Sequence, residues 1–164
     1  MANLILNHNQ IQLKINRLAI EILERNFEEN EVHLVGINTN GGYFAKLLEK
    51  ALLPHVKPTS QIHLYNLLID KNLDVTIELK AKSLENKVVV LIDDVANTGK
   101  TLFYALKPFM NINLKKLEVA VLIDRKHKTF PVQPDYFGLA LATTYQEHID
   151  VTLEQEDFTA YLSN

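Results

Sequence analysis

The stretch Val88–Thr101 reads Val-Val-Val-Leu-Ile-Asp-Asp-Val-Ala-Asn-Thr-Gly-Lys-Thr. Its first residues are apolar and mostly β-branched, which is typical of a buried strand. Two carboxylates, Asp93 and Asp94, stand at the end of this strand, and a short turn leads into a helix expected over Leu102–Phe109. The order of strand, acid pair, turn and helix predicts one unit of an α/β fold.

The turn after the acid pair has the composition of a phosphate-binding loop. Unpaired backbone N–H groups and the helix dipole attract a phosphate-sized anion to a helix N-terminus. Gly99 lets the backbone approach such an anion closely, while Thr98, Lys100 and Thr101 add donors. Neighbouring carboxylates suit ribose hydroxyls or the water shell of Mg²⁺. An acid pair beside a phosphate loop therefore indicates a sugar-phosphate site.

Two other interpretations compete for this stretch. Gly99-Lys100-Thr101 matches the end of a Walker A loop, but that motif requires its first glycine where Asp94 stands, and a carboxylate there repels phosphate. A purely structural turn, with Thr98 as a helix N-cap, explains the Thr-Gly-Lys-Thr cluster. It does not explain why two like charges stand side by side.

Composition places the chain among ordinary globular proteins. It has 164 residues, 47% hydrophobic and 23% charged, so a single domain over residues 1–164 is expected. The absence of cysteine excludes disulfides, thiolate metal sites and a cysteine nucleophile. A net charge of −3 gives no general attraction to nucleic acid. No apolar run has membrane-spanning length and the N-terminus lacks a signal-peptide layout, so no membrane contact and a cytoplasmic location are expected.

Hydrophobic periodicity predicts alternating helices and strands. Helices are expected over Ile11–Phe27 and Tyr43–Leu52, the second after a glycine turn at Asn38–Gly42. Strands are expected over Val32–Ile37, Gln61–Leu67, Val75–Leu79, Leu117–Ile123, Tyr136–Ala140, Ile149–Leu153 and Thr159–Leu162. This order predicts a mostly parallel twisted sheet flanked by helices, with a small hood of short strands.

Polar segments follow several of the predicted strands. In parallel sheets, ligands bind beyond the C-terminal strand edge. The segments Asn38–Gly42, Asp93–Thr101 and Asp124–Lys128 are therefore expected to converge on one pocket. Five histidines show no metal-ligand spacing and are interpreted as structural or surface residues: His8, His33, His55, His63 and His148.

With these motifs the sequence resembles the type I phosphoribosyltransferases, whose PRPP loop is a hydrophobic strand, two acids, a short turn and Thr-Gly-x-Thr. The whole chain resembles the PyrR family of pyrimidine operon attenuators and uracil phosphoribosyltransferases. Leu34–Gly41 is similar to that family's Leu-Val-Gly-Ile-Lys-Thr-Arg-Gly diphosphate loop. Ala120–Pro131 resembles its Ala-Val-Leu-Val-Asp-Arg-Gly-His-Arg-Glu-Leu-Pro segment, and Asp135–Gly138 resembles its Asp-Tyr-Val-Gly.

The resemblance implies a function and a set of site residues. It implies transfer of ribose 5-phosphate from PRPP to a nucleobase, with uracil giving UMP and diphosphate, and Mg²⁺ bound with PRPP. The implied catalytic residues are Asp93, Asp94, Thr39 and Asn40, and the two acids would hold Mg²⁺ through water. The implied PRPP-binding residues are Asp93, Asp94, Val95, Ala96, Asn97, Thr98, Gly99, Lys100, Thr101, Thr39, Asn40 and Gly41. The implied base-binding residues are Tyr136, Phe137 and Gly138, with Asp124, Arg125 and His127 as base or RNA contacts.

The sequence departs from the PyrR pattern at several cations. Asn38 and Asn40 replace Lys and Arg in the diphosphate loop, where positive charge stabilises the leaving group. A non-enzymatic PRPP or UMP sensor that regulates pyrimidine genes therefore stays open as a hypothesis. A phosphoribosyltransferase for another base also stays open, because recognition of the base through the backbone leaves little trace in the sequence. Ile20, Gln133 and Leu139 replace a His, an Arg and a Lys, so specific RNA binding is not expected. The resemblance implies a homodimer or higher homo-oligomer.

Overall fold

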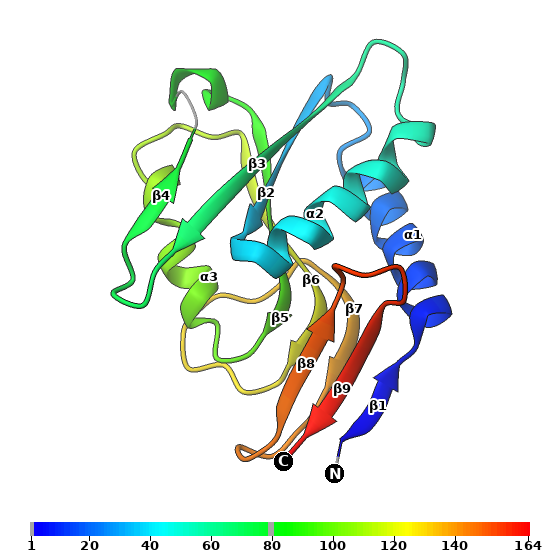
Figure 1. Cartoon of the computed structure of the whole chain (residues 1–164). Helices are drawn as coiled ribbons and strands as arrows, with labels where there is room; N and C mark the ends of the chain where they lie inside the picture. The colour runs from blue at the N-terminus through cyan, green and yellow to red at the C-terminus, as the bar shows by residue number, and fades with distance from the viewer. Residues whose placement is uncertain (1, 79–80) are drawn as a thin grey trace.

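A six-stranded sheet forms the centre of the protein (Figure 1). Its strands, in spatial order, are β4 (Val75–Ile77), β3 (Gln61–Ile69), β2 (Glu31–Ile37), β5 (Val88–Ala96), β6 (Lys116–Arg125) and β7 (Tyr136–Leu141). All neighbouring strands are parallel except β4, which pairs antiparallel with β3 at one edge. The computed structural model describes residues 2–78 and 81–164, and the predicted strand end at Leu79 lies outside them.

A second, three-stranded antiparallel sheet forms the hood. Its strands are β1 (Asn3–Leu6), β9 (Thr159–Ser163) and β8 (His148–Thr152), in that order. Pairing of β1 with β9 brings the two ends of the chain side by side, as Figure 1 shows. The strand β1 was not predicted, because four residues are too few to show a period.

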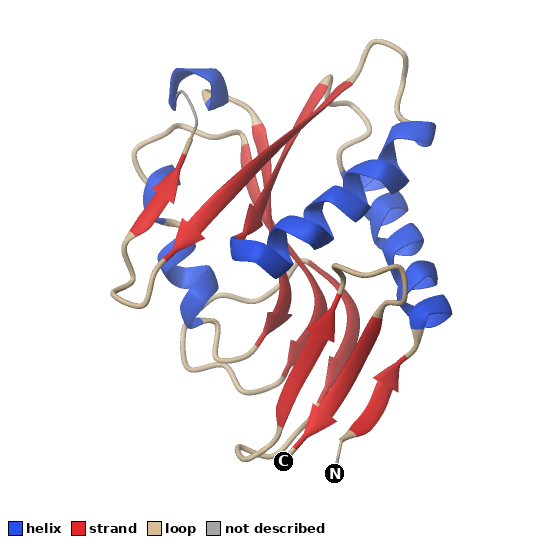
Figure 2. Ribbon diagram, viewed as in Figure 1, coloured by secondary structure: helices blue, strands red, loops and turns tan. Residues whose placement is uncertain are grey.

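Helices cover both faces of the central sheet (Figure 2). The long helices α1 (His8–Arg25) and α2 (Asn38–Leu52) lie on one face, and a short 3-10 segment, η1 (Leu53–His55), follows α2. The opposite face carries α3 (Lys100–Ala105) with the 3-10 segments η2 (Ala81–Leu84) and η3 (Lys107–Phe109).

Alternation along each buried strand separates the core into two halves. Leu34 and Val90 pack against the first pair of helices, whereas Val35 and Val89 pack against the second group. Successive strand side chains point to opposite faces, so a continuous apolar run serves both layers. The α/β class, the mostly parallel sheet and the hood are thereby confirmed.

Helix boundaries differ from the prediction in ways that matter for function. The expected turn at Asn38–Gly42 is the first turn of α2 instead, and the missing side chains of Gly36 and Gly41 let this turn lie directly against the strand ends. The helix expected over Leu102–Phe109 begins at Lys100 and tightens into a 3-10 turn around Pro108. None of the helices in the described parts of the chain is long and apolar enough to cross a membrane.

Candidate active site

The acid pair lies inside the sheet rather than after it. Strand β5 continues through both carboxylates to Ala96, which pairs with Asp124 of β6. Asp93 is buried, and burial together with the negative charge of Asp94 raises its pKa well above the usual value. The Asp94 backbone N–H donates to Asp93 Oδ1 at 2.9 Å. Two neighbouring carboxylates, one of them buried, are stabilised by a bound cation or by hydroxyl donors.

The first turn of α2 lies directly against the acid pair. A Cβ added to Gly41 would lie 2.7 Å from the Ile92 carbonyl oxygen and 3.3 Å from Asp93 Cα. At the end of β2, a Cβ on Gly36 would lie 2.6 Å from the Gly41 carbonyl oxygen. Only glycine permits these approaches, so the glycines place this turn on the ends of β2 and β5.

Asn40 joins the predicted diphosphate loop to the acid pair. Its Nδ2 donates to Asp94 Oδ2 at 2.9 Å and to the Val151 carbonyl of the hood at 3.3 Å. The contact brings together three segments that are far apart in sequence. Asn40 thus occupies the place of the family's arginine with a neutral donor.

Asn38 has a structural task at the start of the same loop. Its φ of 53° is in the left-handed region, which asparagine adopts more readily than most residues. Its Oδ1 accepts a hydrogen bond from the Ile69 backbone N–H at 2.9 Å. The Asn66 amide, with its nitrogen turned toward the loop, donates to the carbonyls of Gly36 at 3.0 Å and Asn38 at 3.1 Å.

A small pocket follows the acid pair at the predicted phosphate loop. It is lined by Asp93, Val95, Ala96, Asn97, Thr98, Gly99, Lys100, Thr101 and Leu102. Gly99 has a φ of 83°, so the loop requires glycine here. The backbone N–H groups of Thr129 and Phe130 both donate to the Thr98 carbonyl at 3.0 Å. The loop is thereby held against the segment after β6.

Residues at and just after the end of β6 hold the predicted phosphate loop through hydrogen bonds. The buried guanidinium of Arg125 donates to Asn97 Oδ1 at 2.9 Å and to Thr143 Oγ1 at 2.7 Å. Lys128 forms an ion pair with Asp124 at 2.5 Å and donates to the Asn97 carbonyl at 3.1 Å. These cations are engaged inside the protein rather than spread on a basic surface.

His127 also has internal partners. Its Nε2 contacts the Thr143 carbonyl, and its ring stacks on Tyr145 with centroids 4.9 Å apart. The sequence placed Asp124, Arg125 and His127 at a base or RNA contact. The structure shows that Arg125 acts on the phosphate loop through Asn97, a link no spacing in the sequence indicates.

The predicted base-binding segment lies at the start of β7. The side chain of Tyr136 is fully buried, and its hydroxyl donates to Glu118 Oε2 at 2.6 Å. Arg17 donates to the carbonyls of Phe137 at 2.9 Å and Gly138 at 3.0 Å. The tyrosine side chain is therefore packed in the core, and Arg17 already occupies the carbonyls of Phe137 and Gly138.

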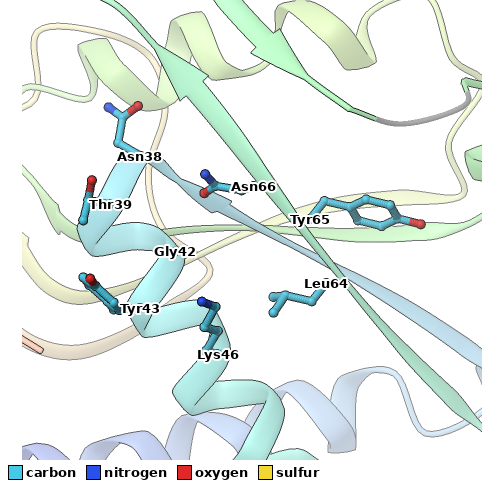
Figure 3. A pocket seen from close by; sticks show the side chains of 8 residues that line it. All are labelled: Asn38, Thr39, Gly42, Tyr43, Lys46, Leu64, Tyr65 and Asn66. Atoms are coloured by element: carbon cyan, nitrogen blue, oxygen red, sulfur yellow. The ribbon is translucent and has the colours of Figure 1, made fainter. Parts of the chain in front are cut away.

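A wider cleft of about 430 Å³ opens on the other side of the α2 N-terminus. Figure 3 shows Thr39, Tyr43 and Lys46 on α2 across from Leu64 and Asn66 on β3. Lys46 was not predicted as a site residue. The sequence could have indicated it, since residues four and seven positions after Thr39 share that residue's helix face.

These features define a class of protein. A mostly parallel sheet with a hood, an acid pair at the end of a central strand and a glycine-containing phosphate loop match the type I phosphoribosyltransferase design. The family model described as the phosphoribosyl transferase domain matches residues 1–156, and the chain belongs to this family.

Its curated relatives include two proteins named Bifunctional protein PyrR. The one from Fusobacterium nucleatum is 35% identical, over 94% of this chain and 92% of its own length. The one from Limosilactobacillus reuteri is 34% identical, over 96% and 94%. Among solved structures, the hypoxanthine phosphoribosyltransferase of Trypanosoma cruzi superposes with a TM-score of 0.77 at 17% identity, covering 96% of this chain and 95% of that one. At that identity, the last likeness supports the fold alone.

Proposed function

We propose that this chain, as a single domain over residues 1–164, transfers ribose 5-phosphate from PRPP to uracil, forming UMP and diphosphate. The hydrogen bond from Asn40 to Asp94 carries the proposal. It joins the diphosphate loop to the acid pair, beside the pocket of the phosphate loop. The segments needed for the two ends of one PRPP molecule thus meet at one edge of the sheet. The resemblance to the PyrR family supports uracil as the base.

Each part of the site has a task in this reaction. Asp93 and Asp94 would hold the ribose hydroxyls and, through water, Mg²⁺, whose preferred ligands are hard oxygen atoms. Bound Mg²⁺ would neutralise charge on the departing diphosphate. Residues 95–101 hold the 5′-phosphate with backbone N–H groups and hydroxyls. The backbone of Thr39, Asn40 and Gly41 faces the diphosphate.

The chemistry itself is a displacement at the anomeric carbon. A nitrogen of the base forms its bond to that carbon as the bond to diphosphate breaks, and the sugar carries oxocarbenium character between the two. The proton of that nitrogen passes to water or to the released diphosphate. The protein contributes orientation and charge stabilisation and needs no side-chain nucleophile. We assign Lys46 as the cation that serves the diphosphate, because it lines one cleft with Thr39. It would compensate for the missing cations at Asn38 and Asn40.

The first test is diphosphate release by the purified chain with PRPP, Mg²⁺ and uracil. A matched control carries Asp93→Asn and Asp94→Asn, which keep the side-chain shapes and remove the charges. Release that depends on uracil and disappears in the control supports the proposal. Release with another base only would assign a phosphoribosyltransferase of different specificity.

One observation favours a sensor as the second candidate. Asn38 and Asn40 are uncharged and their side chains hold hydrogen bonds within the protein, so neither brings a positive charge to diphosphate. Binding of PRPP or UMP by calorimetry, without release for any base, would assign the chain to sensing. Loss of that binding in the control variant would place the ligand at the acid pair.

We propose no specific RNA partner. Arg17, Arg125 and Lys128, cations on the elements that carry attenuator activity in the family, are bonded to acceptors of the protein itself. Phosphate contacts supply most nucleic-acid affinity, so engaged cations weaken it. A homodimer or higher homo-oligomer is proposed from the resemblance, and sedimentation of the purified chain tests it. We also propose a cytoplasmic location.

A further inference from the structure

Two histidines and a glutamate cluster at the N-terminal ends of β2 and β3, away from the acid pair. His33 and His63 are directly paired in the parallel ladder, and Glu31 lies two residues before His33 on the same face. His33 also pairs with Val89 of β5. Asp93 is four residues further along that strand, which corresponds to about 13 Å. The cluster is therefore separate from the proposed PRPP site.

The geometry of the cluster is close to that of a metal site. The two imidazole rings stack with centroids 4.6 Å apart and an interplanar angle of 13°. The Nε2 atoms of His33 and His63 each lie 3.8 Å from a carboxylate oxygen of Glu31. All three donor atoms lie within 4.8 Å of one another. Ligand atoms of tetrahedral zinc lie about 3.3 Å apart and their lone pairs converge on the ion, so binding needs shifts of about 1 Å and a rotation of the partly exposed His63 ring out of the parallel stack.

Both histidines direct an unpartnered buried atom into this cluster. Among the described residues, the Nε2 atoms of His33 and His63 are buried and have no hydrogen-bond partner. His33 is only 3% exposed. The 3.8 Å separation from Glu31 is too long for a hydrogen bond. Since buried polar atoms are normally paired, the two nitrogens indicate a ligand that both can bind.

A neighbouring hydroxyl favours the tautomer of His33 that can bind a metal ion. The Tyr65 hydroxyl lies 3.2 Å from His33 Nδ1; where it accepts the proton of that nitrogen, Nε2 presents its lone pair. Figure 3 shows the Tyr65 ring directed away from α2, on the face opposite Leu64. A neutral imidazole and an ionised carboxylate are the binding forms.

We propose that Glu31, His33 and His63 form a binding site for a zinc-like divalent transition-metal ion. Two imidazoles and one carboxylate are a ligand set that Zn²⁺ takes with a fourth, open position for water. Mg²⁺ prefers oxygen ligands throughout, so this site and the acid pair select different ions.

Lys87 competes with the metal ion for the Glu31 carboxylate. Its Nζ lies 2.5 Å from Glu31 Oε2 and neutralises the carboxylate. The Lys87 side chain is 40% exposed, so it can turn into solvent when the ion binds. Removal of this cation is therefore expected to strengthen metal binding. If the Lys87–Glu31 ion pair served the fold alone, its loss would not strengthen metal binding.

The test is calorimetric titration of the metal-stripped full chain with Zn²⁺, in excess Mg²⁺ to fill oxygen-only sites. One Zn²⁺ per chain is expected, and a zinc excess of about a hundredfold over Kd raises Tm by about 5–10 °C. His63→Ala, at a partly exposed position, should weaken binding by at least about tenfold. His55→Ala removes an exposed histidine elsewhere and should bind as wild type does. Lys87→Ala should bind more tightly.

Co²⁺ gives a second readout, since its visible absorption reports imidazole coordination. The bands should appear in wild type and in Asp93→Asn/Asp94→Asn, and disappear in His63→Ala. The proposal is overturned by absence of Zn²⁺ uptake, by unchanged uptake in both His63→Ala and Glu31→Gln, or by loss of uptake in the acid-pair variant instead.

Discussion

Replacement of Asn38 tests whether this residue shapes the diphosphate loop or contacts the ligand. Asn38→Ala leaves the partly buried Ile69 N–H without its acceptor, which costs about 1–3 kcal/mol. At a φ of 53°, alanine adds strain of about 1–2 kcal/mol. The sum is about 2–5 kcal/mol, and for a chain of this size Tm falls by about 2–4 °C for each kcal/mol.

Two matched variants separate these contributions. Asn38→Gly loses the hydrogen bond but not the freedom to take a positive φ, so it should be more stable than Asn38→Ala by about 1 kcal/mol. Asn38→Asp keeps an acceptor for Ile69 N–H and tolerates the left-handed conformation, so its Tm should stay near that of wild type. Its negative charge should nevertheless weaken PRPP binding.

The assay is thermal unfolding without ligand, followed by calorimetric titration with PRPP and Mg²⁺. Asn38→Lys completes the series, because it restores the family's cation at the cost of stability. We expect a lower Tm together with tighter PRPP binding. Equal Tm values for the Ala and Gly variants, both at the wild-type level, would refute the structural role of Asn38.

Three further outcomes are expected from changes elsewhere in the site and core. The pKa of Asp93 is raised in the folded state, so its ionisation destabilises the fold as pH rises through that pKa. Without Mg²⁺, Asp93→Asn should therefore have a higher Tm than wild type near neutral pH, and this gain should shrink on acidification. PRPP binding should be lost in the same variant. Gly99→Ala places a Cβ 3.1 Å from the Val132 carbonyl oxygen at a φ of 83°, so stability should fall by about 1–2 kcal/mol and PRPP affinity should fall with it. Tyr136→Phe removes the donor to Oε2 of buried Glu118, while Oε1 keeps its hydrogen bond from Asn26; it should lower the free energy of unfolding by about 1.5–3 kcal/mol in urea titrations, with little change in PRPP binding.

Local sequence patterns were sufficient for much of this protein. The apolar run before Asp93 predicted a buried strand, and the glycine and threonines after it predicted the phosphate loop. Both predictions rest on neighbouring residues, whose side-chain period and backbone freedom are local properties. Helix starts were less accurate: α1 begins at His8 because Asn7 and Gln10 form a capping box, three residues before the first periodic apolar position.

Tertiary structure alone decided which distant residues meet. Asn40 reaches Asp94 and the hood, and Arg125 reaches the phosphate loop, through hydrogen bonds between segments that the chain order does not bring together. His33 and His63 showed no metal-ligand spacing, yet parallel pairing of β2 and β3 places them side by side. The sequence by itself therefore determined most of the helices and strands and the residue types that stand in each loop. Strand register and close helix packing decided the contacts, because these depend on the whole sheet and not on neighbours in the chain.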